Sequence, residues 1–327
     1  MEQNIIAAIW DFDKTLISEY MQTPIFEEYG IDPNEFWKET NQLKEYYQKQ
    51  GIKVNPDTIY LNHFITCTKQ GIFKGLNNEK LLSYGKKLRY YKGIPDIFDA
   101  INKNIHTNEI FNTFNITVEH YIVSTGMAQI IRGSSIIGYF RDIWGCEFIE
   151  DVKPSELISN DQDAKKYEPQ KNVCNNKSTK KEICQIGYTI DNTTKTRAIF
   201  EINKGTNIKE LNIDVNSRVN EKFRRIPFEN MIYIADGPSD IPAFSLIRQY
   251  GGKTFAVYPS TSREHFKQVE ELRSNGRIDM YAEADYSEGK TAYMWLIEQT
   301  EEIAQNIYNK KMREINSSTS SVPKHLT

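Results

Sequence analysis

The sequence contains little that would indicate a secreted, membrane-bound or thiolate-metal protein. Its four cysteines, Cys67, Cys146, Cys174 and Cys184, form no closely spaced pair, so neither a disulfide framework nor a zinc site is expected. No apolar run reaches the roughly 18 residues of a transmembrane helix. Residues 1–4 are too polar to begin a secretory signal, so we expect a cytoplasmic protein that does not associate with membranes.

An excess of charge of either sign is also missing. The formal net charge is −3, with 26% charged residues, which excludes the strongly basic composition typical of nucleic-acid-binding proteins. The five histidines include no pair at the spacing of a helical metal site. With 327 residues the chain is long enough for one large domain with an insertion, or for two domains. These features indicate an ordinary globular protein.

Two patterns of apolar residues are present. Residues 5–11 form an apolar run typical of a buried strand, whereas residues 18–90 have helical spacing in segments bounded by Gly, Pro or Asn. Short strands and helices alternate after residue 91. We therefore expect an α/β fold in which helices cover both faces of a parallel sheet.

This pattern predicts a division of the chain. A Rossmann-like core is expected from residues 1–17 and 91–315, and an α-helical cap domain is expected to be inserted at residues 18–90. A polar hairpin or loop insertion interrupts the core at about residues 152–186, and residues 316–327 have the composition of a disordered tail.

Polar residues follow three of the predicted strands at the point where each strand ends. The carboxyl ends of parallel strands lie along one edge of a sheet, where ligands of such folds bind. Side chains two residues apart on a strand also point to the same side. We therefore expect these residues to lie close together. They are Asp11 and Asp13, Ser124 and Thr125, and Asp236 and Asp240.

Several carboxylates without a nearby histidine or cysteine suit a hard cation bound through oxygen, and Mg²⁺ is the expected ion. Ser124 precedes a predicted helix, whose free amide groups and dipole favour an anion such as a phosphoryl group. Taken singly, Ser124 could merely cap that helix, and Asp240 could be an ordinary first-turn acid. Lys195 alone could be a solvated charge on an amphipathic helix. Their joint occurrence favours a site.

These residues resemble the motifs of the haloacid dehalogenase superfamily of phosphatases, in the same order along the chain. The match consists of DFDKT at residues 11–15, Ser124 at a strand end, Lys195 on a helix and DGPSD at residues 236–240. The apolar residues after Lys195 match the family pattern better than those after Lys204, which is the alternative motif lysine.

The resemblance implies a role for each acid. Asp11 would be the nucleophile that attacks phosphorus and becomes an aspartyl-phosphate, and Asp13 would be the general acid and then the general base. Mg²⁺ would be held by the Asp11 carboxylate, the Asp13 backbone carbonyl and Asp236, with Asp240 binding directly or through water.

The resemblance also implies a phosphate pocket. Ser124, with backbone amides near Thr125 and Gly126, would hold the phosphoryl oxygens, and Lys195 would neutralise the negative charges. A helical insertion at residues 18–90 is similar to that of the phosphoserine phosphatase branch, and such a cap would exclude large polymers. Recognition of a substrate carboxylate usually requires an arginine. The predicted cap offers one, Arg89, near its end.

The resulting prediction is a Mg²⁺-dependent phosphomonoester hydrolase that acts on a small phosphorylated metabolite and not on nucleic acid. Two alternatives remain open on the sequence. The first is a phosphotransferase that passes the phosphoryl group from Asp11 to a second substrate. The second is a regulatory module that binds a phosphorylated metabolite without turnover.

Overall fold

The fold centres on one twisted sheet of seven strands in the order β4-β3-β2-β1-β5-β6-β7. The structure is a computed structural model that describes residues 3–151, 181–211 and 213–319. All neighbouring strands are parallel except β3 and β4, which are antiparallel. The strands are β1 (Ile5–Trp10), β2 (Thr117–Met127), β3 (Phe140–Glu150), β4 (Ile183–Tyr188), β5 (Met231–Ala235), β6 (Lys253–Tyr258) and β7 (Met280–Glu283). The predicted parallel α/β sheet is thus confirmed.

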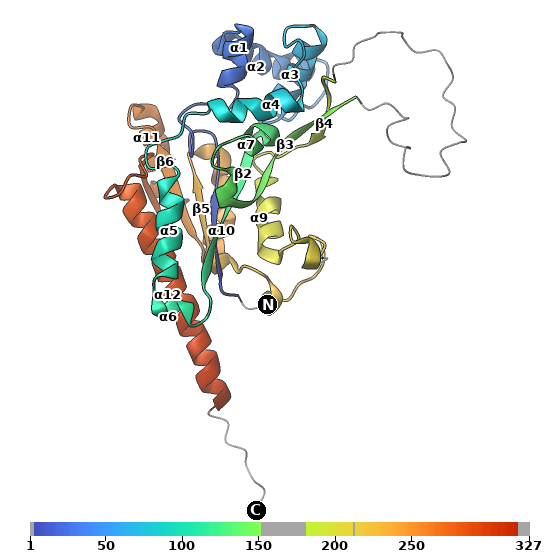
Figure 1. The fold of residues 1–327 in the computed structure, drawn as a ribbon. Helices are drawn as coiled ribbons and strands as arrows, with labels where there is room; N and C mark the ends of the chain where they lie inside the picture. The colour runs from blue at the N-terminus through green and yellow to red at the C-terminus, as the bar shows by residue number, and fades with distance from the viewer. Residues whose placement is uncertain (1–2, 152–180, 212, 320–327) are drawn as a thin grey trace, which may run out of the picture.

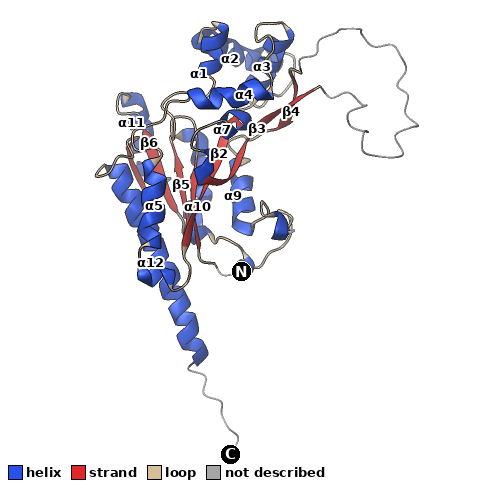
Figure 2. Ribbon diagram, in the orientation of Figure 1, coloured by secondary structure: helices blue, strands red, loops and turns tan. Residues whose placement is uncertain are grey.

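Helices cover both faces of this sheet (Figure 2). Helices α5 and α12 contact each other and pack on β1, β2 and β7, whereas α9 and α10 pack on β2, β5 and β6. The main helices are α1 (Thr23–Tyr29), α2 (Pro33–Lys49), α3 (Ile59–Lys69), α4 (Asn78–Tyr84), α5 (Asp96–His106), α6 (Glu109–Asn112), α7 (Ala128–Arg132), α9 (Lys195–Lys204), α10 (Ile241–Gln249), α11 (Arg263–Ser274) and α12 (Thr291–Thr319). Among the described residues, no helix combines the length and apolarity needed to cross a membrane.

The core sits between the sheet and its helices. Residues of β1, such as Ile6 and Trp10, are fully buried, and so are Tyr121 on β2 and Tyr233 on β5. Continuous apolar burial of this kind is expected for central parallel strands that are covered on both faces. The central strands β2, β1 and β5 are therefore rigid supports for the residues at their carboxyl ends.

Helices α1 to α4 gather beyond the carboxyl ends of β1, β2 and β5 (Figure 1). We call them the α1–α4 region. Its two connections to the sheet lie side by side, because Ile17 bridges Tyr90 and the Ser18 amide donates to the Arg89 carbonyl at 3.0 Å. The helices expected at residues 18–90 are thus present, although a separate cap domain with these bounds stays a prediction.

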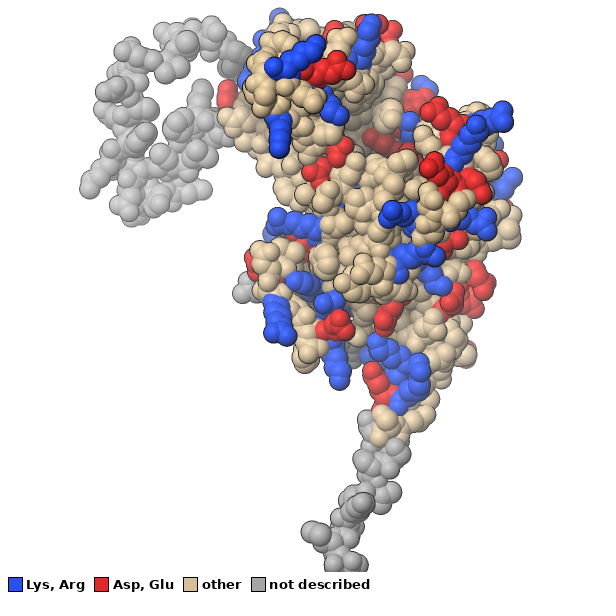
Figure 3. All heavy atoms as spheres, turned by 180° about the vertical axis from the view of Figure 1, so that it is seen from behind, with Lys and Arg blue, Asp and Glu red and all other residues tan. Residues whose placement is uncertain are grey.

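The predicted insertion and the predicted tail fall only partly within the described residues. Most of the insertion predicted at about residues 152–186 lies outside the described residues, and its end forms β4. The predicted tail, residues 316–327, starts inside α12, whose backbone is helical to Thr319, and its remainder lies outside the described residues. The face in Figure 3 carries Lys, Arg, Asp and Glu interspersed over its surface, in keeping with the small net charge.

Candidate active site

The pairing of the strands places the predicted motifs at the same edge of the sheet. Trp10 on β1 pairs with Ile122 on β2 and with Ile234 on β5, so the next residues of all three strands meet at the same edge. The Asp11 backbone amide continues the ladder by donating to the Ile234 carbonyl at 2.8 Å. The end of β1 therefore fixes Asp11 at the same edge as Asp236, although the two lie far apart in the chain.

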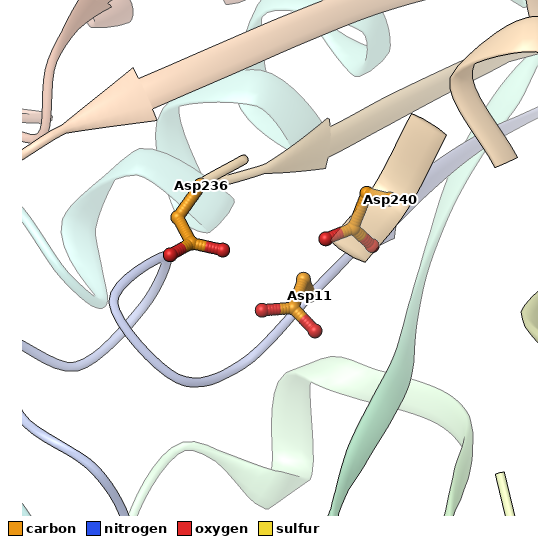
Figure 4. Close-up of side chains that lie close together, drawn as sticks. All are labelled: Asp11, Asp236 and Asp240. Atoms are coloured by element: carbon orange, nitrogen blue, oxygen red, sulfur yellow. The ribbon is translucent and has the colours of Figure 1, made fainter. Parts of the chain in front are cut away.

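Asp11, Asp236 and Asp240 form one acidic cluster. Each offers a carboxylate oxygen, and these three oxygens lie within 4.8 Å of one another. Figure 4 shows the three side chains close together, Asp236 from the end of β5 and Asp240 from the following turn. The structure thus brings together three of the four residues predicted as metal ligands.

Lys195, the first residue of α9, supplies the positive charge of this cluster. Its side chain is 1% exposed, and Nζ donates to Asp11 Oδ1 at 2.8 Å and to Asp240 Oδ1 at 2.6 Å. Burial alone would lower the pKa of Lys195, but the adjacent Asp11 and Asp240 carboxylates raise it, so the amine stays charged. Tyr233, which the sequence did not single out, also donates to Asp240 Oδ1 at 2.6 Å.

Lys204 lies elsewhere. Its Nζ donates to the backbone carbonyls of Val215 at 2.5 Å and Ser217 at 2.9 Å, in the loop after α9. Lys195 and Lys204 are the first and last residues of the same helix, so only the first reaches the sheet edge. The geometry favours Lys195 as the motif lysine.

The positive charge of Lys195 does not balance the negative charge of the surrounding carboxylates. Burial raises the pKa of Asp11 to about 6 despite the attraction of Lys195, and the charge of Asp240 adds to this rise. Burial, followed by the charges of Asp11 and Asp240, raises the pKa of Asp236 to about 8. The arrangement is therefore short of positive charge, and a divalent cation held through oxygen atoms would relieve the repulsion.

Asp13 lies beside this cluster. Its Oδ1 accepts the backbone amide of Met21 at 2.9 Å. Burial raises the pKa of Asp13 well above its ordinary value, and the charge of Asp11 raises it further. Asp13 therefore holds a proton more readily than an exposed aspartic acid does.

The environment of Ser124 differs from the prediction in one respect. The expected helix does not begin next to Ser124, because β2 continues to Met127 and α7 starts at Ala128. Ser124 is 1% exposed, and its Oγ accepts the amide of Gly126 at 3.0 Å. The helix expected after Ser124, Thr125 and Gly126 is thus present, but Ser124 does not lie at its first turn. The side chain instead projects from an extended strand end.

Tyr60 of the α1–α4 region and Met21, in the loop before α1, reach the same segment. Tyr60 on α3 donates its phenol to the Thr125 carbonyl at 2.8 Å, and Met21 Sδ accepts the Met127 amide at 3.0 Å. Met21 also fills the space beside Gly126, where an added Cβ would lie 2.1 Å from the Met21 Cε atom. No sequence motif marks Met21 or Tyr60 as a residue of the site.

Arg89, the arginine of the predicted cap, forms ion pairs with glutamates. It is exposed and lies near Glu19, with Nη1 donating to Oε1 at 3.2 Å, and near Glu27 at 3.9 Å. In this structure Arg89 is thus paired with glutamates at the surface.

The parallel sheet, the acids at the ends of β1 and β5 and the helices above them together define a haloacid dehalogenase-like hydrolase fold. A HAD family hydrolase from Salmonella enterica subsp. enterica serovar Typhi has this fold, with a TM-score of 0.50 and 13% identity over 91% of this chain and 72% of that one. The chain belongs to the same family as an uncharacterized protein of Borreliella burgdorferi, to which it is 36% identical over 301 residues, 90% of this chain and 96% of the relative.

A structure of phosphoserine phosphatase is also similar, at 16% identity over 90% of this chain and 98% of that chain, with a TM-score of 0.44. A likeness at that score carries no argument about the substrate. No family model matches the sequence. The resemblance that the motifs indicated is thus confirmed at the level of the fold.

Proposed function

We propose that this protein is a Mg²⁺-dependent phosphomonoester hydrolase that acts on a small phosphorylated metabolite through an aspartyl-phosphate. The observation that carries the proposal is the buried carboxylate of Asp11, which contacts the ammonium of Lys195 and shares its surroundings with Asp236 and Asp240. A carboxylate supported by a fixed cation, at the edge of the sheet where ligands bind, is suited to attack phosphorus.

In the first step, an oxygen of Asp11 forms a bond to phosphorus while the bond from phosphorus to the leaving oxygen breaks. Protonated Asp13 gives its proton to that oxygen, so the alcohol product leaves neutral. In the second step, Asp13 takes a proton from water as the water oxygen attacks the phosphorus. The bond to Asp11 then breaks, which releases phosphate and regenerates both carboxyl groups. The raised pKa of Asp13 suits this cycle, because it must both give and take a proton.

The residues present fit Mg²⁺, because the donors are carboxylate oxygens and the pKa of Asp236 stays raised despite the positive charges of Lys195 and Lys14. Asp11, Asp236 and the backbone carbonyl of Asp13 would hold the ion. Asp240 already accepts hydrogen bonds from Lys195, Tyr233 and Ser239, so we assign it mainly to orienting Lys195. When bound, the ion neutralises charge so that an anionic nucleophile and an anionic phosphate can approach each other.

Ser124, the backbone amides near Thr125 and Gly126, and Lys195 would bind the phosphoryl oxygens. Donors fixed before the reaction begins stabilise the charge that develops in the transition state, without any cost of reorganisation at that moment. The position of Ser124 on a rigid strand end, 1% exposed, supports this assignment. In this structure the Gly126 amide donates to Ser124 Oγ at 3.0 Å and so holds this hydroxyl in place.

The surroundings of the site support a small substrate. Asp11 is only 5% exposed beneath the α1–α4 region, so a large polymer would not reach it. Recognition of a substrate carboxylate commonly uses an arginine. Arg89 is exposed and lies beside Glu19 and Glu27, which argues against phosphoserine as the substrate.

The test is phosphate release from a panel of phosphorylated metabolites with Mg²⁺ present. We expect the wild type to release phosphate, Asp11→Asn to release none, and EDTA to abolish turnover until Mg²⁺ is added back. Asp285→Asn, at an acid outside the cluster, is the matched control and should stay active. Release that persists in Asp11→Asn would remove Asp11 from the mechanism, and indifference to EDTA would remove the metal.

A further inference from the structure

Two contacts join the α1–α4 region to the segments that we propose hold the phosphoryl group and the lysine. Both come from the part of this region formed by α3 and the loop before it. Tyr60 reaches the end of β2, and Asn55 reaches the turn that begins α9. These contacts connect residues far apart in the chain, so they form only when the region lies over the sheet edge.

Tyr60 is built into its position. Its phenol donates to the Thr125 carbonyl at 2.8 Å, and its ring packs against Trp37 and Phe64 at centroid distances of 5.8 Å and 6.3 Å. The residue is only 6% exposed. Burial raises the pKa of Tyr60 well above its ordinary value, and the nearby Cys146 and Asp13 raise it further, so the phenol keeps its proton and remains a donor.

The Thr125 carbonyl belongs to the segment whose amides would face the phosphate. Cys146 Sγ on β3 lies 3.3 Å from the same oxygen, so Tyr60 and the neighbouring strand hold it from two sides. Since a peptide group is planar, fixing this carbonyl also fixes the amide of Gly126 on the other side of the bond. Tyr60 thus sets the orientation of a donor without touching the substrate.

Asn55 contacts the turn that precedes α9. Its Nδ2 donates to Asp191 Oδ2 at 2.8 Å, while Asp191 Oδ1 accepts the amides of Thr193 at 3.0 Å and Thr194 at 2.7 Å. The Lys195 amide donates to the Asp191 carbonyl at 3.0 Å. Asp191 therefore organises the turn from which α9 presents Lys195, and Asn55 holds Asp191 from the α1–α4 region.

We propose that Tyr60 and Asn55 are positioning residues through which the α1–α4 region, when it lies over the sheet edge, fixes the phosphate-binding strand end and the turn that presents Lys195. The kinetic consequence rests on the proposed function, whereas the effect on the backbone of β2 and α9 does not. Such coupling would make the site complete only when it is covered, which protects the aspartyl-phosphate step from an open, misaligned geometry.

The experiment compares Tyr60→Phe with Tyr29→Phe. The first change removes one hydroxyl and keeps the ring packing, whereas Tyr29 is a matched control because its phenol donates to Lys74 within the α1–α4 region at 3.0 Å. Hydrogen exchange with mass spectrometry measures the amides of residues 121–127. We expect several-fold faster exchange there in Tyr60→Phe, and no change there in Tyr29→Phe.

The second readout is turnover of p-nitrophenyl phosphate with Mg²⁺. We expect kcat to fall about tenfold in Tyr60→Phe, the effect of about one lost hydrogen bond, while KM changes less than about twofold. Asn55→Ala should speed exchange at the turn before α9 in the same way, with the exposed Asn34→Ala as its control.

The possible outcomes separate this proposal from the proposed function. If the wild type releases no phosphate from any substrate, the proposed function fails, and the exchange data alone then decide on Tyr60. Unchanged exchange at residues 121–127, or unchanged kcat in an active enzyme, would overturn the positioning role. If exchange became equally faster in β6, which is separated from β2 by β1 and β5, the change would indicate general destabilisation and would also overturn the positioning role.

Discussion

At the scale of single residues, the charge of Lys195 is what permits Asp11 and Asp240 to lie side by side away from water. Burying ions costs several kcal/mol each, and only close pairing offsets that cost. The pairing distances of 2.8 Å and 2.6 Å meet this condition, and the lysine side chain is almost fully covered. Removing the Lys195 ammonium group would leave the Asp11 and Asp240 carboxylates without their positively charged partner.

This argument predicts different results for the two lysines of α9. Lys195→Met should lower kcat/KM by at least about a hundredfold, because Asp11 and the phosphate lose their fixed counter-charge. Lys204→Met should stay within about threefold of the wild type, since Lys204 holds only the Val215 and Ser217 carbonyls. Phosphate release is the measurement, with circular dichroism to verify folding. Equal losses in both variants would contradict the assignment of Lys195.

His120 should make the protein less stable in acid. Burial lowers the pKa of His120 from 6.5 to about 3, and its Nδ1 accepts the indole N–H of Trp10 at 3.2 Å. Below pH 6.5 the unfolded chain binds a proton that the folded protein does not, so stability falls as the pH drops toward 3. The loss is about 1.4 kcal/mol per pH unit in this window.

Urea unfolding of His120→Gln at pH 6 and pH 4 tests this effect. The free energy of unfolding of the variant should fall by about 2–3 kcal/mol less than that of the wild type between these pH values. The exposed His106→Gln serves as the control and should keep the wild-type slope. An identical slope in His120→Gln would show that the buried ring is not responsible.

The residues of the site differ in how far the sequence could predict them. Asp11 and Asp236 follow apolar strands directly, so the pattern places them at the sheet edge, and the structure brings them together. Tyr233 could not be predicted, because a tyrosine inside an apolar strand looks like any core residue until its hydroxyl meets Asp240. Met21 could not be predicted either, since its role depends on how the α1–α4 region sits over Gly126.

At the scale of helices and strands, the α1–α4 region is joined to the sheet by a close approach of α4 and α7. An added Cβ at Gly133 would lie 1.7 Å from the Leu82 carbonyl oxygen, and one at Gly85 would lie 2.3 Å from the Gly133 carbonyl carbon. Both obstacles are backbone atoms, which cannot rotate away. Glycine is therefore required here for space.

Gly133→Ala should accordingly separate α4 from α7. We expect the free energy of unfolding to fall by about 3 kcal/mol, the upper range for overpacking, as measured by urea denaturation. Gly138→Ala is the matched control, because its Cβ would meet nothing within 4 Å. A loss of less than about 1 kcal/mol in Gly133→Ala would mean that the two helices shift apart at little cost.

The end of strand β2 differs from the prediction, which ended the strand before Ser124. The segment of Ser124, Thr125 and Gly126 breaks the apolar run, as a turn before a helix would. In the structure these residues remain extended, and β2 pairs with β3 as far as Met127 with an irregular register after Val123. Tertiary pairing overrides the local signal here, and such pairing cannot be read from a short polar segment.

At the scale of the whole molecule, folding brings together acids that lie far apart in the chain. Local patterns predicted the sheet and its two-sided covering, because each strand carries its own signal. They could not give the order of the strands or the contacts of Tyr60 and Asn55, which depend on how distant segments pack. The bounds of a separate cap domain stay a prediction for the same reason.

Metal binding should therefore stabilise the entire fold. The oxygens of Asp11, Asp236 and Asp240 lie within 4.8 Å of one another, and Lys195 pairs only with Asp11 and Asp240, so folding works against their repulsion and a bound cation offsets it. A ligand that binds only the folded state stabilises it by about 2.7 kcal/mol at a hundred times its Kd.

We expect Mg²⁺ to raise the Tm of the wild type and of the control Asp285→Asn, and to leave the Tm of Asp236→Asn almost unchanged. Thermal unfolding followed by circular dichroism measures this without any substrate, so the result does not depend on catalysis. Without metal, Asp236→Asn should be at least as stable as the wild type, because one repulsive carboxylate is gone. A Mg²⁺-dependent rise in Asp236→Asn equal to that of the wild type would place the ion outside this cluster.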